Sequence, residues 1–528
     1  MIKTIIKKGA YFDSVSLMQV AKKINVLAGV IDSAVVMATR ENKGIIKSSG
    51  LLTPEILKAG DSDLAIAVSA KTPAAAEAAF AAAEELLNRK PSQPAAGADR
   101  KAAGLDDAVK TLEGANMAVI SVAGRFAGAL AAECLEKNLN VMLFSDNVTV
   151  ETELALKRAA VRKGLLLMGP DCGTAIINGA PIAFANSVRR GNIGVVAASG
   201  TGLQEVTALI SNEGAGVSQA IGTGSRDVKL EIGALTLLQA LKMLAADPAT
   251  EVLLVVSKPP HPLILKKITA EIKKIKKPVV AVFLGGEVKE KIKENFYPAK
   301  TLEEAAYKAV CLSKGWSLGR AREIIYDMNL KAAALAKKEA AKKKRASCLR
   351  GLFSGGTFVS EAQVILPELI GDTWSNAPLD KKWKLKDSLK LSGHAVIDMG
   401  EDEFTVGRPH PMIDFSLRNK VIISEARKPE VSVLLLDVVL GYGSNLKPLE
   451  DIVPAIAEAF LRNPELSVVA SVTGTETDPQ VRSKVVKGLE AAGVIVMPSN
   501  AGACRLAGGI IRLGAKKPAG NKYSEIKS

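Results

Sequence analysis

Short, uninterrupted apolar runs recur along most of the chain and alternate with longer amphipathic segments. Between residues 105 and 315 these runs are MAVISVAG, VMLFS, GLLLMG, IGVVAAS, VLLVVS and PVVAVFLGG. The pattern resumes between residues 346 and 515 with CLRGLFSGG, SVLLLDVVLG, LSVVASVTGT and GVIVMPS. Strands that are apolar at every position are typical of parallel sheets covered by helices on both faces. The predicted fold class is therefore α/β.

The first 90 residues follow a different pattern. The runs IKTIIKKGAY, VIDSAVVMAT and DLAIAVSA predict three strands, and the segments between and after them predict amphipathic helices. This order predicts a small ferredoxin-like α+β domain at residues 1–90, followed by a linker at 91–104 that is rich in proline, alanine and glycine. The α/β part is expected to divide into domains at 105–190, 191–315 and 346–515.

The net charge of +15 raises the question of a nucleic-acid partner. Seven basic residues and one acidic residue fall within Lys331–Arg345, a composition typical of a solvated, Ala/Lys-rich helical linker. The remaining charge is dispersed, and aromatic residues make up only 4% of the chain, too few for a protein that stacks bases. The basic balance favours small anionic substrates instead.

The five cysteines are scattered and form no CxxC pair, which favours free thiols in a reducing cytoplasm over disulfides or a zinc site. No apolar run approaches the roughly 20 residues that span a bilayer. The N-terminal sequence MIKTIIKKGAYFDS also lacks a signal-peptide core. We therefore expect a cytoplasmic protein without a membrane partner or a nucleic-acid partner.

The two α/β regions after residue 190 repeat the same order of parts. Each begins with a strand, a glycine loop and a helix, in VVAASGTGLQE and GLFSGGTFVSE, where Gly200 and Gly356 are 156 positions apart. Later parts match at larger offsets. This indicates a diverged duplication with an insertion at about 370–410; chance similarity between α/β units is the alternative.

The paired glycine loops are candidate phosphate sites. Glycine lets a backbone approach a ligand closely, and the N–H groups at a helix start attract an anion. Each loop alone could be an ordinary turn before a helix, but two in a duplicated pair suggest two helix starts that face one phosphate. The residues predicted to bind it are Ser199, Gly200, Thr201, Gly355, Gly356 and Thr357.

Other candidates lie where strands end, because open α/β sheets bind ligands beyond the carboxyl ends of their strands. The predicted substrate-binding residues are Asp437, Gly441, Gly443, Thr473, Gly474 and Thr475. The predicted catalytic residues are Arg408, His410 and Asp171. A guanidinium group can hold a carboxylate or phosphate through two parallel hydrogen bonds. No metal is expected, and the acidic residues expected to face water are Asp398, Asp402 and Asp414.

Four motifs in order, GPDCGTAI, GNIGVVAASGTGLQE, SVLLLDVVLGYG and ASVTGTETDP, resemble the FdrA family of the succinyl-CoA synthetase superfamily. The segments EDEFTVGRPHPMID and KKGAYFDSVSLM resemble it as well, so the similarity covers nearly the whole chain. The resemblance implies a Rossmann-like CoA-binding domain at 105–190 and flavodoxin-like domains at 191–315 and 346–515, with paired helices that hold a phosphate. The loop SVAGRFAG keeps glycines where the superfamily meets CoA, but it lacks the usual Thr-Gly-x-Gln-Gly. The residues expected to contact CoA, should it bind, are Gly124, Arg125, Ser145 and Asn147.

Two departures from the superfamily bear on activity. Its members carry phosphate on a histidine after the strand that here reads VVAVFLGG, but this chain continues GGEVKEKIKENF without one. The supporting glutamate expected after VLLVV is replaced by Ser257-Lys258-Pro259-Pro260, and no ATP-grasp domain is recognised. The comparison therefore implies no phosphohistidine and no self-contained nucleotide-dependent ligase.

What the resemblance implies instead is acyl-phosphate chemistry, in an oxamate carbamoyltransferase subunit. In that reaction carbamoyl phosphate and oxamate exchange with oxalurate and phosphate, and the chain would work with partner subunits or as a homodimer. Positioning and electrostatics can support such a transfer without a covalent enzyme intermediate. One alternative is an acyl-CoA synthetase-type ligase subunit that binds CoA. The other is a non-catalytic scaffold that senses CoA or phosphate.

Overall fold

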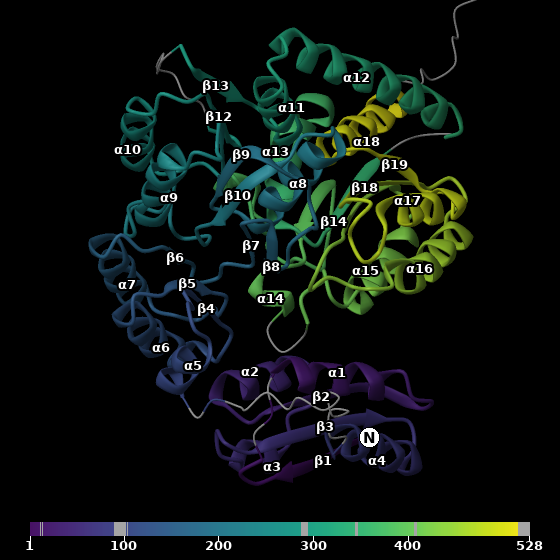
Figure 1. The fold of residues 1–528 in the computed structure, drawn as a ribbon. Helices are drawn as coiled ribbons and strands as arrows, with labels where there is room; N and C mark the ends of the chain where they lie inside the picture. The colour runs from purple at the N-terminus through teal and green to yellow at the C-terminus, as the bar shows by residue number, and fades with distance from the viewer. Residues whose placement is uncertain are drawn as a thin grey trace, which may run out of the picture. The chain divides into compact units, whose positions relative to one another are not determined.

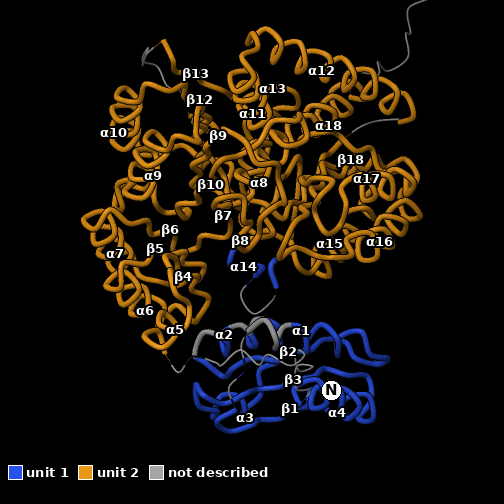
Figure 2. Tube along the Cα trace, in the orientation of Figure 1, with its two compact units in different colours: residues 1–103, 401–410 blue, residues 104–400, 411–528 orange. Residues whose placement is uncertain are grey.

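The structure is a computed structural model that describes residues 1–10, 12, 14–88, 102, 104–286, 294–343, 347–405 and 409–515. It divides into two compact units (Figure 2). One comprises residues 1–103 with 401–410, and the other comprises residues 104–400 with 411–528. Each unit has its own sheet or sheets and its own apolar core.

The first unit is built on a three-stranded antiparallel sheet in the order β1-β3-β2 (Figure 1). Its elements are β1 (Ile2–Lys7), α1 (Ser14–Asn25), β2 (Val30–Met37), α2 (Arg40–Ser48), α3 (Pro54–Lys58), β3 (Leu64–Ala70), α4 (Pro73–Asn88) and α14 (Asp402–Thr405). Along β3, Leu64 and Ile66 pack with α1 and α4, whereas Ala65 and Ala67 pack with α2 and α3. Successive residues of a strand point to opposite faces, so helices cover both faces of this sheet. The three predicted strands and the small N-terminal domain are confirmed.

The second unit begins with a short parallel sheet in the order β4-β5-β6. Its elements are α5 (Leu105–Thr111), β4 (Met117–Ile120), α6 (Gly124–Glu136), β5 (Asn140–Leu143), α7 (Val150–Arg162) and β6 (Leu167–Met168). The Thr149 side chain caps α7 by accepting a hydrogen bond from the Thr152 N–H at 3.2 Å. Because the strands are parallel, the loops that follow them meet at one edge of the sheet.

A larger sheet follows in the order β13-β12-β11-β9-β10-β7-β8. Its elements are β7 (Thr174–Ile177), β8 (Ala180–Ala183), β9 (Arg190–Ala197), α8 (Gly200–Asn212), β10 (Val217–Gly222), α9 (Leu235–Ala246), β11 (Val252–Ser257), α10 (Pro262–Ile272), β12 (Val279–Phe283), β13 (Phe296–Ala299) and α11 (Leu302–Ser313). Counted from β9, the five parallel strands have the order 2-1-3-4-5, which is flavodoxin-like. The order reverses between β9 and β11, and sheets of this type bind ligands at that point.

The last sheet has six parallel strands in the order β15-β16-β14-β17-β18-β19. Its elements are β14 (Cys348–Phe353), α13 (Gly356–Ile370), β15 (Thr373–Ser375), η1 (Lys381–Trp383), β16 (His394–Asp398), α15 (Ser416–Ala426), β17 (Val431–Val439), α16 (Pro448–Arg462), β18 (Ser467–Thr473), α17 (Arg482–Ala491), β19 (Ile495–Met497) and α18 (Asn500–Ala515). Without β15, the order β16-β14-β17-β18-β19 matches β10-β9-β11-β12-β13 of the preceding sheet. The additional part, β15 with η1, falls within the insertion expected at about 370–410, and the match supports the predicted duplication.

Helix α12 (Leu318–Ala341) corrects the expectation of a solvated linker at Lys331–Arg345. The stretch is helical up to Ala341, but Ala332, Ala336 and Ala340 are buried. They recur every four residues, so they share the face of α12 that packs against α18. Lys343 is buried beyond the helix, where its Nζ donates to the Ser432 carbonyl at 3.0 Å and burial lowers its pKa to about 8. The many lysines of this segment made its apolar face difficult to recognise in the sequence.

The α/β class with parallel sheets is confirmed, whereas the individual domain boundaries stay predictions. One detail differs from the expected division at residue 190. Strands β7 and β8 precede that residue, but they extend the sheet of β9 and β10 through the antiparallel pair β7–β10. Among the helices of the described residues, none is both long enough and apolar enough to cross a membrane.

Candidate functional site

The first turns of α8 and α13 lie against each other. A hydrogen bond joins the Ser199 and Thr357 hydroxyl groups. A Cβ atom on Gly355 would lie 2.7 Å from Thr201 Cγ2, and one on Gly202 would lie 3.0 Å from Thr357 Cγ2. Side chains at these two positions would therefore push the helices apart. The two glycine loops predicted from the sequence are brought together, and their binding of phosphate stays a prediction.

The two helix starts differ in how their N–H groups are satisfied. In α8 the Ser199 side chain accepts a hydrogen bond from the Gly202 N–H at 3.0 Å. In α13 the corresponding residue is Gly355, and no described side chain caps the helix. The Phe358 N–H, the counterpart of the Gly202 N–H, donates instead to the Gly355 carbonyl at 3.0 Å. Both helix starts carry a partial positive charge, and in each the N–H groups of the first two residues have no acceptor among the described residues.

Two charged side chains border the start of α13. A Cβ atom on Gly356 would lie 2.2 Å from Asp398 Oδ2 and 3.5 Å from Lys258 Nζ. Asp398 ends β16 and accepts a hydrogen bond from the Gly400 N–H at 2.9 Å. Lys258 follows β11, and no described residue pairs with its ammonium group. The Lys258 ammonium group and the helix start favour an anion here, whereas the Asp398 carboxylate opposes one.

Sequence reasoning missed both of these side chains. It expected Asp398 to face water with other acidic residues, but the residue is only 4% exposed because it is the last residue of β16, which lies between two other strands of the sheet. Asn376 holds that strand end through two hydrogen bonds of 2.9 Å with the Asp398 backbone. Lys258 was noted only as a replacement for a glutamate. The usable signal was its place directly after β11, at the point where the strand order reverses.

Asp437 is buried and engaged within the protein. Its carboxylate accepts hydrogen bonds from the Ser354 N–H at 2.8 Å and from the Ser354 hydroxyl at 2.6 Å. It also forms an ion pair with Arg418, with 2.9 Å between Oδ1 and Nη1. The predicted substrate residue thus lies under the loop that begins α13, where its contacts hold that loop in place.

The predicted substrate glycines after β17 and β18 lie against other parts of the chain, where a side chain would not fit. A Cβ atom on Gly441 would lie 2.6 Å from the Ala185 carbonyl oxygen, and one on Gly443 would lie 2.9 Å from the Phe184 ring. A Cβ atom on Gly474 would lie 2.8 Å from the Leu440 side chain. In this structure these positions serve close packing.

The threonines beside Gly474 are engaged as well. The Thr475 hydroxyl donates to the Ser187 carbonyl at 2.6 Å, and the Thr473 hydroxyl donates to Glu205. Asp478 completes this contact by accepting a hydrogen bond from the Asn186 side chain at 2.8 Å. The bonds to Asn186 and Ser187 fix that segment against the last sheet, and the bond to Glu205 fixes α8 there.

The predicted CoA-contacting residues lie in adjacent loops at the edge of the β4-β5-β6 sheet. A Cβ atom on Gly124 would lie 2.7 Å from the Asn147 carbonyl oxygen, and the Ser145 hydroxyl accepts a hydrogen bond from the Val122 N–H at 3.0 Å. Arg125 is exposed and its guanidinium group lies 4.9 Å from the centre of the Phe126 ring. These four residues are brought together, and CoA binding stays a prediction.

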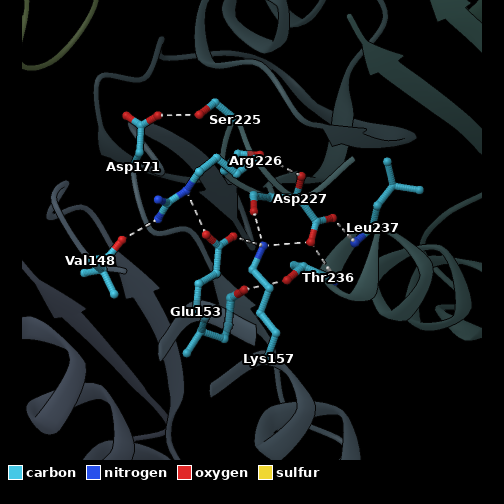
Figure 3. A network of polar contacts seen from close by, with 12 residues as sticks. Val148, Glu153, Lys157, Asp171, Ser225, Arg226, Asp227, Thr236 and Leu237 are labelled. Carbon is cyan, nitrogen blue, oxygen red and sulfur yellow. Dashed lines mark hydrogen bonds and ion pairs between the residues drawn. The ribbon is translucent and has the colours of Figure 1, made fainter. Parts of the chain in front are cut away.

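Asp171, the third catalytic candidate, joins this edge to the larger sheet. Its N–H donates to the Ser145 carbonyl at 3.1 Å, and its carboxylate accepts a hydrogen bond from the Ser225 hydroxyl at 2.7 Å (Figure 3). Three residues further on, Thr174 Oγ1 would lie 3.3 Å from a Cβ atom on Gly200. The segment that contains Asp171 therefore runs from the predicted CoA loops to the start of α8.

A buried charge network lies next to Asp171 (Figure 3). Lys157 on α7 forms ion pairs with Glu153 at 3.1 Å and with Asp227 at 2.7 Å, and all three side chains are fully buried. Arg226 forms an ion pair with Glu153 at 2.9 Å and donates to the Val148 carbonyl at 2.7 Å. The network ties α7 to the loop that follows β10.

Of the predicted pair Arg408 and His410, Arg408 lies outside the described residues and His410 belongs to the first unit. The two other histidines serve local structure. His261 Nδ1 accepts a hydrogen bond from the Leu263 N–H at the start of α10, and burial lowers the pKa of His394. No group of three or more His, Cys, Asp or Glu side chains suited to a metal occurs among the described residues.

Two glutamates that sequence reasoning missed lie in the second turns of α8 and α13. Glu205 and Glu361 are the sixth residues of the two helices and are buried at the contact between the two halves. Burial raises the pKa of Glu205, and it raises the pKa of Glu361 to about 8. The 156-residue offset between the glycine loops also relates these glutamates, so the duplication was the signal that could have found them.

Comparison with known proteins identifies the family of this chain. Residues 352–510 match the family model of CoA-ligases. The chain is 44% identical to the Escherichia coli K12 protein YahF over 503 residues, which cover 94% of this chain and 96% of YahF. The chain belongs to the FdrA family. The family lies within the succinyl-CoA synthetase superfamily, so the resemblance carried by the sequence motifs is confirmed.

A more distant sequence similarity agrees with this superfamily. The FdrA-family chain is 28% identical over 175 residues to a succinate–CoA ligase [ADP-forming] subunit alpha 1 of Archaeoglobus fulgidus. That match covers 32% of this chain and 58% of the ligase subunit. Among solved structures, the dinucleotide-forming acetyl-coenzyme A synthetase 1 of Candidatus Korarchaeum cryptofilum aligns over 75% of this chain and 83% of its own, with 16% identity and a TM-score of 0.31.

Residues 1–103 match a model described as AllF, heavy metal-associated domain. This stretch contains neither cysteine nor histidine. Thiolate and imidazole are the ligands that soft and borderline metals prefer, so the residues present do not fit a heavy-metal site. No metal-dependent step is therefore derived for this domain.

Proposed function

We propose that this FdrA-family chain is an acyl-transferring subunit of the acid–thiol ligase type, and that it holds an acyl phosphate where α8 and α13 begin. Family membership and the similarity to a succinate–CoA ligase subunit support the ligase class. The observation that carries the site is the contact between the two helix starts, with Lys258 unpaired beside them. The phosphoryl oxygens of an acyl phosphate suit both helix N–H groups and an ammonium group.

The proposed step is attack of a nucleophile on the acyl carbon. A bond forms between the nucleophile and that carbon, and the bond from the carbon to the bridging phosphate oxygen breaks. Inorganic phosphate leaves with the electron pair, and the nucleophile releases its proton to the phosphate or to water. Positive groups placed at the phosphate stabilise the charge that develops on it. This exchange needs no phosphohistidine, in agreement with the sequence GGEVKEKIKENF.

With CoA as the acceptor, the nucleophile is its thiol and the product is a thioester. The residues that would hold CoA are Gly124, Arg125, Ser145 and Asn147, in the adjacent loops of the β4-β5-β6 sheet. The exposed guanidinium group of Arg125 suits a CoA phosphate. Asp171 would orient the acceptor, since its segment leads from these loops to the start of α8.

Carbamoyl transfer from carbamoyl phosphate to oxamate is the second candidate. The absence of a histidine after β12 favours it, because a reaction confined to carbamoyl phosphate needs no phosphate carrier toward a nucleotide. Here the nucleophile is the oxamate nitrogen, and the products are oxalurate and phosphate. In either reaction the chain would work with partner subunits in a hetero-complex or as a homodimer.

The test is phosphate release by the full-length chain, measured alone and as a complex isolated from its host. Acetyl phosphate or carbamoyl phosphate is supplied with CoA, with oxamate, or with no acceptor. CoA-dependent release supports the ligase type, and oxamate-dependent release supports carbamoyl transfer. Lys258→Ala should reduce release at least tenfold, whereas Lys266→Ala, on the exposed side of α10, should not. Binding without turnover would indicate a sensing scaffold, and neither binding nor turnover would refute both candidates.

A further inference from the structure

The loop before α13 is held in place at Ser354, which directly precedes the N-cap residue Gly355. Ser354 donates two hydrogen bonds to one carboxylate, from its N–H to Asp437 Oδ1 at 2.8 Å and from its hydroxyl to Oδ2 at 2.6 Å. Two bonds from one residue fix its backbone and its side chain together. Gly355 and Gly356 follow directly, so the position of Ser354 determines where the first N–H groups of α13 point.

Arg418 in turn holds Asp437. Its Nη1 donates to Oδ1 at 2.9 Å and to the Asp437 carbonyl oxygen at 2.8 Å. The guanidinium group is fully buried and lies 4.5 Å from the centre of the Phe415 ring. Its Nε and Nη2 have no hydrogen-bond partner among the described residues. Burying an ion pair costs desolvation energy that apolar side chains of the same volume would not cost, so stability alone is a weak explanation for it.

In the other half of the duplication, a different contact holds the start of α8. In the α8 half, Val256 occupies the strand position that corresponds to Asp437, as the pairing of β9 with β11 and of β14 with β17 shows. There the Ser199 side chain caps its own helix at the Gly202 N–H. In α13 the corresponding Phe358 N–H donates to the Gly355 carbonyl at 3.0 Å, and the loop is held by Asp437 through Ser354 instead of by a side-chain cap.

We propose that Asp437, held by Arg418, is a positioning residue that fixes the start of α13, where the N–H groups of Gly356 and Thr357 are available to the anion. The pair acts from beneath the loop, through Ser354, and does not itself touch the substrate. This assignment rests on the proposed function, in which the start of α13 holds the phosphoryl group. Loss of the hydrogen bonds between Ser354 and Asp437 is therefore expected to weaken anion binding more than it lowers the stability of the fold.

The experiment compares Ser354→Ala and Asp437→Asn with a matched control in the same sheet. The control is Glu425→Gln, which alters the buried Arg350–Glu425 ion pair, 2.8 Å long, without touching Ser354. The measurements are the Kd for carbamoyl phosphate, thermal unfolding, and hydrogen–deuterium exchange of the amides in residues 354–358, all on the full-length chain. Ser354→Ala removes one hydroxyl and keeps the ion pair, so it remains informative if Asp437→Asn fails to fold.

We expect Ser354→Ala to raise the Kd about tenfold and to speed exchange at 354–358, the size of effect that one lost hydrogen bond to a charged group gives. Glu425→Gln should lower the melting temperature but leave the Kd and the exchange at 354–358 unchanged. An equal change of Kd in both variants, or unchanged exchange at 354–358 in Ser354→Ala, would overturn the positioning role. If the wild-type chain binds no carbamoyl phosphate, the proposed function fails. The exchange comparison then decides the positioning role on its own.

Discussion

The backbone N–H of Asn500 donates a hydrogen bond to the Glu205 carboxylate, with 3.0 Å between N and Oε1. The Leu302 N–H donates in the same way to Glu361 Oε1, at 2.7 Å. Asn500 and Leu302 are the first residues of α18 and α11, the last helices of their respective halves. Each glutamate thus accepts a hydrogen bond from the first N–H group of a helix in the other half. This reciprocal exchange follows from the duplication and fixes α8 and α13 against each other.

The pH dependence of stability should reveal the protonation of Glu361. Burial raises its pKa to about 8 from an ordinary value of 4.5, and the nearby carboxylates of Glu205 and Glu303 act in the same direction. Between these two pH values the folded chain holds a proton that the unfolded chain has released. The free energy of unfolding should therefore fall as pH rises from about 5 to 8, by up to about 1.4 kcal/mol per pH unit from this group.

Urea unfolding of wild type and Glu361→Gln between pH 5 and 9 checks this dependence. The glutamine variant should show a shallower loss of stability toward pH 8, because it has no proton to lose. Glu323→Gln, an exposed change on α12, should keep the wild-type slope. Identical slopes in wild type and Glu361→Gln would mean that Glu361 is ionised throughout this range.

Alanine substitution should destabilise the chain more at Gly356 than at Gly200. At Gly356 a Cβ atom would lie 2.2 Å from Asp398 Oδ2, so the carboxylate or the helix must move. At Gly200 the nearest atom, Thr174 Oγ1, would lie 3.3 Å away, which a small shift relieves. We expect Gly356→Ala to cost about 1–3 kcal/mol of unfolding free energy and Gly200→Ala less than about 1 kcal/mol, measured in urea. Equal costs would contradict the asymmetry between the two helix starts.

Cys172 should resist alkylation although it lies in the GPDCGT segment beside Asp171. The thiol is 2% exposed, and burial raises its pKa to about 12. Thiolate is the reactive form, so iodoacetamide at pH 7.5 should leave Cys172 unmodified in the folded chain and modify it after denaturation. Peptide mass spectrometry reads this out, with Cys348, which is partly exposed, as the internal control. Rapid labelling of native Cys172 would show a reactive thiol.

The charge network in Figure 3 should be sensitive to removal of a single charge. Asp227→Asn leaves Lys157 buried with only Glu153, whose charge is shared with Arg226. Breaking a buried pair in this way typically costs about 3–5 kcal/mol, whereas Glu450→Gln, in an exposed pair with Lys447, should cost less than about 1 kcal/mol. Urea midpoints of the two variants test the contrast. A similar small cost in both would show that the network is solvated.

Strands and helix starts were predictable because local sequence determines them. Runs such as VLLVV are apolar at every position, and Gly200 and Gly356 are the first residues of helices that follow a strand. The paired loops could be found because the duplication places them 156 residues apart. Their contact through Ser199 and Thr357 agrees with that reasoning.

The remaining parts of the site depend on contacts between distant segments. Asp478 binds Asn186 across 292 residues, and Glu205 binds Thr473 across 268, so no local pattern indicates either pair. Composition gave a wrong prediction in two places. The lysines of 331–345 indicated a solvated segment although one face of α12 is packed, and the acidic neighbours of Asp398 indicated exposure although it is buried at a strand end.

Binding of an acyl phosphate where α8 and α13 meet underlies both candidate reactions. Isothermal titration of the full-length chain with carbamoyl phosphate, and separately with inorganic phosphate, measures this binding. We expect binding by wild type, and at least tenfold weaker binding in a Gly356→Asp variant whose circular dichroism is unchanged, because a second carboxylate beside that of Asp398 would lie at the helix start and repel the anion. Wild-type affinity in folded Gly356→Asp, or no binding by wild type, would rule out this binding site.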